Sequence, residues 1–475
     1  MLGKKKAQKA DKNMKDKDNE TMEKVISLCK RRGFVFQGSE IYGGLAGTWD
    51  YGPLGVSLKK NIENIWWNMF VDSRPDVYGL DAAILMNENV WKASGHVDSF
   101  SDPLVEDKKT KKRYRADHLL EEAGINPAGM TISEMSAEIV RAEIKSPDGN
   151  EFGEVQNFKM MFETKIGASE DAGVTYLRPE TAGGIFVNFK NVVDSFHPKL
   201  PFGIAQIGKA FRNEIAPRDF IFRVRELEQM EIEYFVREET WEENFEHWRK
   251  NVWNYVDKIG LPRDMVHELE VGDKDRAHYS KRTIDFEFDY PFGRKELYGL
   301  AYRGNYDLTK HKEGSTANID YVDSESGEKI LPHVIEPSLG VGRTFLAILT
   351  SAYTEDELDG EPRVFLKLKP SVAPIKVAVF PLLKNKPELV AKAQEVFEMI
   401  RTEIPQIGFD TNGNVGKRYR RQDEIGTPYC VTVDFETIES EKPDDAEVTV
   451  RDRDTGKQER IKIKDLINYL KEKIN

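Results

Sequence analysis

The stretch FRNEIAPRDFIFRVRELEQMEIEY, from Phe211 to Tyr234, decides the fold that we expect for this chain of 475 residues. Side chains in a β-strand alternate between its two faces with a period of two residues. Counted in this way, one face carries the apolar residues Phe222, Val224, Met230, Ile232 and Tyr234, interrupted by Glu226 and Glu228. The other face carries Arg223, Arg225, Leu227, Gln229 and Glu231. The pattern predicts a strand with one face toward a core and one strongly charged face.

A second strand is expected directly before it, over PFGIAQIGKAFRNE, with Arg212 and Glu214 on one face. The link IAPRD (215–219) contains a proline and can close an antiparallel hairpin with a short loop. Arginine suits bidentate contact with phosphate, and glutamate can accept from an ammonium group or an adenine amine. The alternative is a ladder of cross-strand ion pairs, each contributing roughly 0.2–1 kcal/mol. A run this dense, which also includes Arg218, favours a binding site.

The composition is that of a soluble, globular protein, with 39% hydrophobic and 32% charged residues. A net charge of −12 argues against nonspecific DNA binding, although local basic patches leave specific RNA binding open. Cys29 and Cys430 lie far apart, which excludes a disulfide framework and a cysteine zinc site. The eight histidines form no i, i+4 pair, so a histidine-bound metal is not expected. With no secretory signal or membrane-spanning run, we expect a cytoplasmic protein.

Composition and periodicity divide the chain into three parts. Residues 1–20 are lysine-rich and predict a disordered basic tail. Residues 21–370 predict one large domain with an inserted subdomain at about 75–160, where lysine and glutamate dominate and periodicity is weak. Beyond a proline-flanked linker, strands alternate with helices, which predicts a small α/β domain over residues 374–475. Its densest basic patch, KRYRR (417–421), fits either a solvated helix start or contact with a nucleic-acid backbone.

Two common nucleotide-binding signatures are missing from the sequence. No G-x-x-x-x-G-K-[ST] occurs, which excludes a P-loop. The glycines of GGLAGTWDYGPLG lack the strand and helix that surround a dinucleotide fingerprint, which argues against an oxidoreductase. Phosphates are therefore expected to be held by arginine side chains on an antiparallel sheet.

Several ordered motifs together resemble the glycyl-tRNA synthetases of the dimeric class II type. GTWDYGPLGVSLKKNIENIWW, FRNE with FRVRELEQME, and EPSLGVGR (336–343) are similar to the three class II motifs. ASGHVDSFSDP, RADHL, LRPETA and DEIGTP are similar to stretches peculiar to the glycyl family. The resemblance implies an α+β fold: an antiparallel sheet flanked by helices, followed by a C-terminal α/β anticodon-binding domain. It also implies a homodimer that uses ATP with Mg²⁺, glycine and tRNA(Gly).

The resemblance also implies roles for individual residues. Arg212 would bind the α-phosphate of ATP and stabilise developing charge, and Arg343 would hold the γ-phosphate, so both are the catalytic candidates. Glu214 would accept from the adenine amine, and Glu296 would contact ATP through Mg²⁺. The full ATP set is Arg212, Asn213, Glu214, Phe222, Arg223, Val224, Arg225, Glu226, Leu227, Glu296, Leu297, Gly340, Val341, Gly342 and Arg343.

For glycine, the resemblance implies two carboxylates, Glu180 and Glu231, and the hydroxyl of Ser338. Because glycine has no side chain, rejection of alanine must rest on steric exclusion. The full glycine set is Arg115, Glu180, Leu227, Glu228, Gln229, Met230, Glu231, Glu336, Pro337, Ser338, Leu339 and Gly340.

Three departures from the family pattern carry their own expectations. Leu227 stands where a phenylalanine is usual, which predicts weaker ATP binding because the aromatic face is lost. Gly183 stands where glutamine is usual. Asp107 and Thr110 stand where some relatives have cysteines, so no zinc is expected in the insertion.

A non-catalytic nucleic-acid-binding protein with the same fold is the remaining alternative, since fold alone does not fix function. Such a protein is expected to lose the phosphate-binding arginines and the substrate glutamates. They are all present here, which favours an enzyme.

Overall fold

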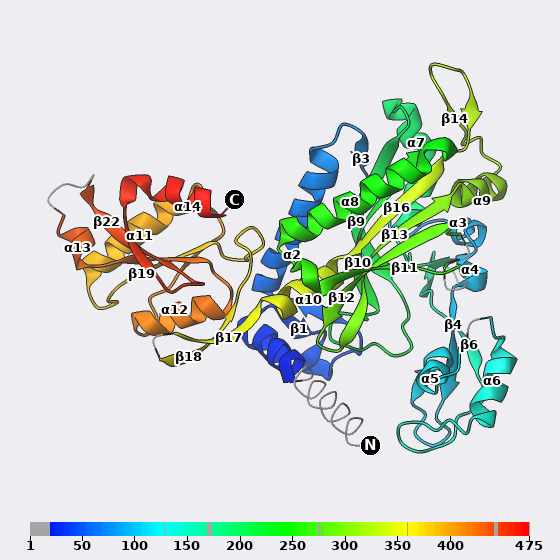
Figure 1. Cartoon of the computed structure of the whole chain (residues 1–475), viewed down its shortest axis with the longest axis horizontal. Helices are drawn as coiled ribbons and strands as arrows, with labels where there is room; N and C mark the ends of the chain where they lie inside the picture. The colour runs from blue at the N-terminus through cyan, green and yellow to red at the C-terminus, as the bar shows by residue number, and fades with distance from the viewer. Residues whose placement is uncertain are drawn as a thin grey trace.

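A computed structural model describes residues 20–474 except 128, 169–172, 274–275, 278, 359 and 441–444. The tail predicted over residues 1–20 lies outside the described residues, apart from Glu20, which begins a helix over 20–32. Figure 1 shows an inserted subdomain at one end of the molecule and the C-terminal α/β unit at the other. Among the described helices, none has the length and apolar character needed to span a membrane.

A seven-stranded sheet forms the centre of the molecule (Figure 1). Every neighbouring pair is antiparallel except β3 and β9, which run parallel. This confirms the expected antiparallel sheet. In spatial order the strands are β11 (Val266–Glu270), β12 (Arg282–Tyr290), β13 (Gly293–Gly304), β16 (His333–Gly340), β10 (Glu226–Val236), β9 (Phe202–Phe211) and β3 (Val77–Gly79).

Helices cover both faces of this sheet. On one face, α2 (Pro53–Trp67), α8 (Trp241–Ile259) and α10 (Val341–Ala352) pack in the same hydrophobic core as the even-numbered residues of β10. On the other face, α7 (Ala182–Phe196) and α9 (Tyr306–Ser315) pack with Phe235 and with residues of β9. Helix α2 starts with a proline, whose fixed φ suits the first turn, and continues as a π-helix over Asn68–Asp72. Because both faces of β10 are covered, Glu231 and Glu233 are buried together with its apolar residues.

The expected hairpin exists, but its connection is long rather than short. Strand β9 ends at Phe211 and β10 begins at Glu226, so residues 212–225 form a loop and the period-two count fails there. Asp219 and Phe220 have φ of 59° and 58°, in the left-handed region, which is incompatible with a continuous strand. Arg225 fixes the loop from within, because its guanidinium donates to the carbonyl oxygens of Ala46 (2.7 Å) and Glu214 (3.2 Å).

The insertion has its own small core. A three-stranded sheet of β5 (Arg113–Arg115), β4 (Ser101–Glu106) and β6 (Gln156–Lys159) packs with α5 (Ala116–Glu122) and α6 (Ile132–Arg141). The short helices α3 (Glu88–Ala93) and α4 (His96–Ser99) precede it, and the hairpin of β7 (Glu163–Ile166) and β8 (Gly173–Tyr176) follows it.

Asp107 closes the turn where some relatives carry cysteines. Its buried carboxylate accepts from the backbone N–H groups of Lys109 and Thr110, both at 2.8 Å, and from the Ser146 hydroxyl at 2.5 Å. Burial raises the pKa of Asp107, but these hydrogen bonds outweigh it and hold the pKa well below its usual range. A hydrogen-bonded carboxylate therefore ties this turn together.

The C-terminal unit is a mixed five-stranded sheet with a separate core. Its strands, in spatial order, are β20 (Ile407–Phe409), β19 (Val377–Pro381), β21 (Tyr429–Val433), β22 (Glu447–Asp452) and β23 (Gln458–Lys462). Its helices are α11 (Pro387–Arg401), α12 (Val415–Glu424), α13 (Phe435–Ile438) and α14 (Leu466–Ile474). The hairpin of β17 (Tyr353–Leu358) and β18 (Glu361–Leu366) connects it to the rest of the chain.

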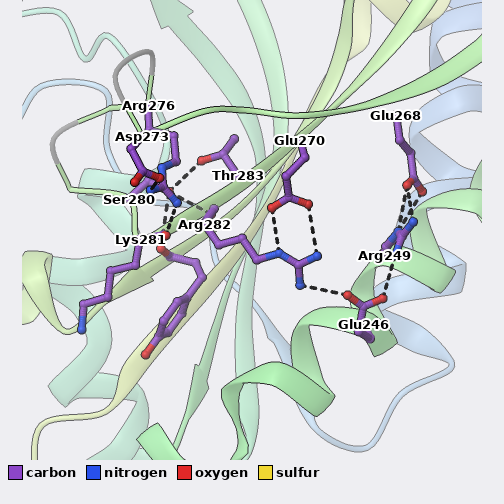
Figure 2. Close-up of polar contacts among 11 residues, drawn as sticks. Glu246, Arg249, Glu268, Glu270, Asp273, Arg276, Ser280, Lys281, Arg282 and Thr283 are labelled. Carbon is purple, nitrogen blue, oxygen red and sulfur yellow. Dashed lines mark hydrogen bonds and ion pairs between the residues drawn. The ribbon is translucent and has the colours of Figure 1, made fainter.

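A network of ion pairs follows one edge of the central sheet, between α8, β11 and β12 (Figure 2). Arg249 binds Glu268 at 2.9 Å and Glu246 at 3.0 Å. Arg282 binds Glu270 at 2.9 Å, and it binds the second carboxylate oxygen of Glu246 at 2.9 Å as well. Each arginine thus bridges two carboxylates. We call this set of five residues the edge network.

Candidate active site

A cavity of about 320 Å³ opens where the start of β10, the end of β16 and the loop 212–225 meet. Its lining includes fifteen of the residues expected to bind substrates: Arg212, Glu214, Phe222, Arg223, Val224, Glu226, Leu227, Glu228, Gln229, Glu296, Leu297, Ser338, Gly340, Gly342 and Arg343. Segments more than a hundred residues apart in the sequence therefore converge on one space.

Arg212 is half-buried at the wall of this cavity. Its Nε donates to the carbonyl oxygen of Pro179 at 3.0 Å, and its guanidinium lies 5.7 Å from the centre of the Phe100 ring. These contacts fix the side chain without engaging its two terminal nitrogens. Among the described residues, no hydrogen bond from those nitrogens is found, so they can receive an anion.

Arg223 and Arg225 have different environments although the sequence placed them together. The Nε of Arg223 pairs with Glu214 at 3.0 Å inside the cavity. Burial is the main reason why the pKa of Arg223 is lowered, and Glu214 acts in the opposite direction. Arg225 instead holds the loop to Ala46 and does not line the cavity.

Arg343 and Glu296 form a pair at the far wall. Their side chains approach to 3.1 Å, and the Arg343 guanidinium lies 4.7 Å from the centre of the Phe222 ring. The charge of Arg343 is the main reason why the pKa of Glu296 is lowered. A β-bulge between Phe286 and Glu287 leaves Leu297 without a partner and places Glu296 opposite Glu287.

Asp285 on the neighbouring strand lies close enough to these carboxylates to respond to their charge. Burial, followed by repulsion from Glu296 and Glu287, raises the pKa of Asp285 to about 7. The donor set of this wall is thus rich in carboxylate oxygens, which is the chemistry that Mg²⁺ prefers. Within the described residues, no group of three or more His, Cys, Asp or Glu side chains has a metal-binding arrangement of its own.

Glu231 lies fully buried next to the cavity, under a set of donors. One of its oxygens accepts from the backbone N–H groups of Thr181 (3.1 Å) and Ala182 (3.0 Å) and from the Thr181 hydroxyl. The other accepts from Gln229 (2.6 Å) and from Ser338 (2.7 Å). Burial raises the pKa of Glu231, and repulsion from Glu180 adds to it.

Glu180, the second carboxylate expected to bind glycine, lies near Glu231. The Nε2 of His96 lies 3.5 Å from its carboxylate. Burial raises its pKa, but His96 and the positive charges of Arg303 and Arg212 outweigh burial and lower the pKa to about 2. Glu180 is therefore ionised, and it lies close enough to Glu231 for its charge to raise the pKa of that carboxyl.

A buried charged cluster lies near these two carboxylates. Arg303 donates to Asp307 (2.7 Å) and to Glu336 (2.9 Å), and all three are buried. Glu233, two residues after Glu231, is fully buried, and neither of its oxygens has a hydrogen-bond partner among the described residues. Burial raises the pKa of both carboxyls. Repulsion from Glu336 adds to the shift of Glu233, and repulsion from Glu231 and Glu180 adds to that of Glu336, so this carboxyl pair retains a proton at neutral pH.

Some expected residues do not line the cavity. Arg115 pairs with Asp102 at 2.6 Å and with Asp117, at the edge of the insertion. Burial, with repulsion from Glu214, raises the pKa of Asp102, so this pair lies near the loop 212–225. The other expected residues outside the lining are Asn213, Arg225, Glu180, Met230, Glu231, Glu336, Pro337, Leu339 and Val341.

Four lining residues were missed by the sequence reading: Trp49, Tyr51, Lys209 and Ile221. Trp49 and Tyr51 alternate on the short strand β2 (Trp49–Tyr51), which pairs with β1 (Val35–Gln37). Their spacing of two residues in TWDY was an available signal. Arg303, Asp307 and Glu233 were also missed, because buried charges in apolar segments have no local signature.

The basic patch KRYRR is engaged by the protein itself. Arg418 is buried and donates to the carbonyl oxygens of Thr411 (3.1 Å) and Gly413 (2.7 Å). Arg421 pairs with Asp410 at 2.6 Å. The patch is therefore mainly structural, and the picture of a freely solvated helix start is wrong for Arg418.

Gly183 has a steric explanation. A Cβ at this position would lie 2.9 Å from the ring of Trp91, which is fully buried. The indole thus occupies the space that a side chain would need, and glycine is required by packing.

Comparison with known proteins agrees with the geometry of both units. Residues 162–352 match the family model described as the tRNA synthetase class II core domain (G, H, P, S and T). Residues 376–473 match the model described as an anticodon binding domain.

Full-length relatives give the same result. The chain is 50% identical over 469 residues to a glycine–tRNA ligase of Clostridium acetobutylicum, with 96% of this chain and 100% of the relative covered. It is 48% identical over 463 residues to that of Caldanaerobacter subterraneus subsp. tengcongensis (96% and 98% covered). The value for Deinococcus radiodurans is 47% over 505 residues (96% and 99% covered). The chain therefore belongs to the glycine–tRNA ligase family of class II aminoacyl-tRNA synthetases.

Proposed function

We propose that the protein activates glycine with ATP and transfers the glycyl group to the 3′ end of tRNA(Gly). One observation carries the proposal: the position of Arg212. Its charge acts on Glu180 and Glu231 on one side and on Glu296 on the other. It thus lies between a pocket that suits an ammonium group and a cavity that suits a polyphosphate. The α-phosphate and the glycine carboxylate must meet at such a point.

In the first step, a carboxylate oxygen of glycine attacks the α-phosphorus of ATP, and pyrophosphate leaves. The open nitrogens of Arg212 bind the α-phosphate and neutralise the charge that develops there. Preorganised groups of this kind often supply the largest catalytic contribution. No protein nucleophile is needed, because positioning brings the reacting atoms together.

The adenine is assigned to the part of the cavity between Glu214, Phe222 and Arg343. Glu214, oriented by Arg223, accepts from the adenine amine. Phe222 offers an aromatic face, over which Arg343 already lies. Arg343 also binds the γ-phosphate in this proposal.

The residues around Glu296 fit Mg²⁺ bound with ATP. Glu296 is ionised, and burial together with repulsion from Glu296 and Glu287 raises the pKa of Asp285, so a cation bound here would offset part of that repulsion. Mg²⁺ binds through one or two carboxylates together with substrate phosphates, and it neutralises phosphate charge when bound. Glu296, with Asp285 beside it, is the proposed protein contribution.

Glycine is held by its ammonium group between Glu180 and Glu231. The hydrogen bonds from Thr181 and Ser338 fix the Glu231 carboxylate, so it cannot turn away to fit a larger substrate. Exclusion of alanine then rests on the fixed walls of the pocket, since one methyl in an adaptable pocket changes binding by only about 1–3 kcal/mol.

The remaining assignments complete the proposal. Residues 21–370, with the insertion at about 75–160, form the catalytic domain, and residues 374–475 bind the anticodon. The enzyme acts as a cytoplasmic homodimer. No zinc is assigned to the insertion.

The test is ATP–pyrophosphate exchange with purified protein. Glycine should support exchange, and alanine and serine should not. Absence of glycine-dependent exchange from folded protein would contradict the proposal and favour the non-catalytic alternative.

A further inference from the structure

The two carboxylates assigned to the glycine ammonium are held in different ways. Glu231 accepts hydrogen bonds on both oxygens, among them those from the Ala182 N–H at 3.0 Å and the Ser338 hydroxyl at 2.7 Å. Among the described residues, Glu180 has one ion-pair partner, the Nε2 of His96 at 3.5 Å. The side chains of Glu180 and His96 are each 13% exposed, so protein surrounds most of this contact. The position of the Glu180 carboxylate therefore depends on where His96 is held.

His96 is itself fixed on three sides. Its ring packs against Trp91 and Phe100, with the ring centres 5.5 Å and 5.6 Å away. Its Nδ1 lies 2.8 Å from the hydroxyl of Ser94, the residue that ends α3. The two rings restrict the movement of the imidazole, and Ser94 determines which of its edges faces Glu180.

The Ser94 hydroxyl also decides which nitrogen of His96 carries the hydrogen. The hydroxyl lies 3.3 Å from the carbonyl oxygen of Trp91, and its contact with Nδ1 at 2.8 Å is the shorter of the two. Because the shorter hydrogen bond is the stronger one, Ser94 donates to Nδ1. In a neutral imidazole, Nε2 then carries the hydrogen and can donate to Glu180. The opposite tautomer would turn a lone pair of Nε2 toward a carboxylate, which is unfavourable.

We propose that His96, oriented by Ser94, is a positioning residue that presents Glu180 to the ammonium group of glycine. This inference rests on the proposed function, which places the ammonium between Glu180 and Glu231. His96 engages one oxygen of Glu180 and leaves the second oxygen to accept from the ammonium. It touches no substrate and acts through the carboxylate. Without His96, the Glu180 side chain would turn to other rotamers, and binding of glycine rather than of ATP would weaken.

Substitution of His96 tests this role in the ATP–pyrophosphate exchange reaction. His96→Leu keeps an apolar side chain between the two rings and removes the donor. KM for glycine should rise by about tenfold, because a hydrogen bond to a charged group is lost. Both kcat and KM for ATP should stay within about twofold of wild type, the signature of lost substrate binding alone. His96→Gln keeps an N–H donor close to the position of Nε2 and should regain most of the affinity for glycine.

Ser94→Ala tests whether the serine acts through His96. It should raise KM for glycine by about threefold, because Nδ1 loses its partner and both tautomers become available. In combination with His96→Leu it should have no further effect, since the two residues form one chain of contacts. The matched control is Ser99→Ala. Ser99 is an exposed residue of α4 whose hydroxyl donates to the carbonyl oxygen of Gly95 at 2.8 Å, and its loss should change none of these constants.

A cavity of about 370 Å³ that His96 lines allows a test with added small molecules. His96→Ala extends this cavity into the space of the imidazole ring. Free imidazole should then enter and lower KM for glycine of His96→Ala by about threefold or more, because it restores the donor. Thiophene, a five-membered ring without an N–H group, should have no such effect. Equal rescue by both rings would assign the ring of His96 to packing and would overturn the inference.

The remaining outcomes are also decisive. An unchanged KM for glycine in the His96 variants and in Ser94→Ala would overturn the inference, and so would equal increases in KM for glycine and for ATP. Thermal melts identify any variant that fails to fold, and Ser94→Ala and His96→Gln then carry the test. Absence of glycine-dependent exchange in wild type would instead overturn the proposed function, so the two failures are distinguishable.

Discussion

The edge network and the stretch around Arg212 are both dense in arginine and glutamate, yet only one is suited to bind a ligand. In the edge network, Arg249 and Arg282 each bridge two carboxylates, so their charges are paired within the protein (Figure 2). Among the described residues, Arg212 has one carbonyl partner and a ring beside it, and its two terminal nitrogens make no hydrogen bond. A structural network differs from a binding site in that its charges are paired with one another, and not in how densely the charges occur.

The sharpest test of this comparison is Arg212→Ala against Arg282→Met. Arg212→Ala should reduce exchange by about 100–1,000-fold with little change in melting temperature, because the group acts on developing charge. Arg282→Met should leave exchange unchanged and lower stability by about 1 kcal/mol or less, as exposed pairs do. Exchange rates and thermal melts measure both. Loss of exchange in Arg282→Met would remove the distinction.

Glu231→Gln tests whether the Glu231 carboxylate, which already accepts hydrogen bonds from the protein on both oxygens, also binds the ammonium group of glycine. We expect kcat/KM for glycine to fall by about 10–100-fold, since a hydrogen bond to a charged group contributes about 1.5–3 kcal/mol. KM for ATP should stay within about twofold, which separates this effect from general damage. An unchanged kcat/KM for glycine would show that Glu231 has a structural role only, as the residues of the edge network do.

Glu233→Gln tests the buried carboxyl pair through pH. Burial and repulsion raise the pKa of Glu233 and Glu336, so the folded state binds protons that the unfolded state releases. Stability is then fully present below the ordinary carboxyl pKa and is lost as pH rises through the raised values. The melting temperature of wild type should fall as pH rises from about 5 toward 8, and the variant should show a flatter profile. Parallel profiles would contradict the shared proton.

Leu227→Phe should give the smallest effect. The sequence predicted weak ATP binding because Leu227 offers no aromatic face. Phe222 lines the same cavity and supplies one, so we expect the added ring to tighten ATP binding by less than about threefold, below the usual 1–3 kcal/mol for stacking on an aromatic. Equilibrium titration with ATP measures it. A tenfold gain would show that the cavity lacks an effective aromatic face.

Much of the fold was predictable because its signals are local. The residue pattern predicted the core of β10 and the strand β9 directly before it. The pattern failed over residues 212–225, where charged and apolar residues alternate but the chain forms a loop. An alternating pattern shows only that neighbouring side chains lie in different environments. A loop that is fixed by Arg225 can place its side chains in different environments just as a strand does.

By itself, the sequence determined the kinds of group available to the site: arginines for phosphate, paired glutamates for an ammonium, and an antiparallel sheet to carry them. Only the tertiary structure decided which charges are free. Arg225 and Arg418 are held by backbone carbonyls, whereas Arg212 is left open. It also created the Arg303–Glu336–Glu233 cluster, whose members come from distant segments. The physical reason is that a charge is neutralised by neighbours in space, and these are set by packing rather than by position in the chain.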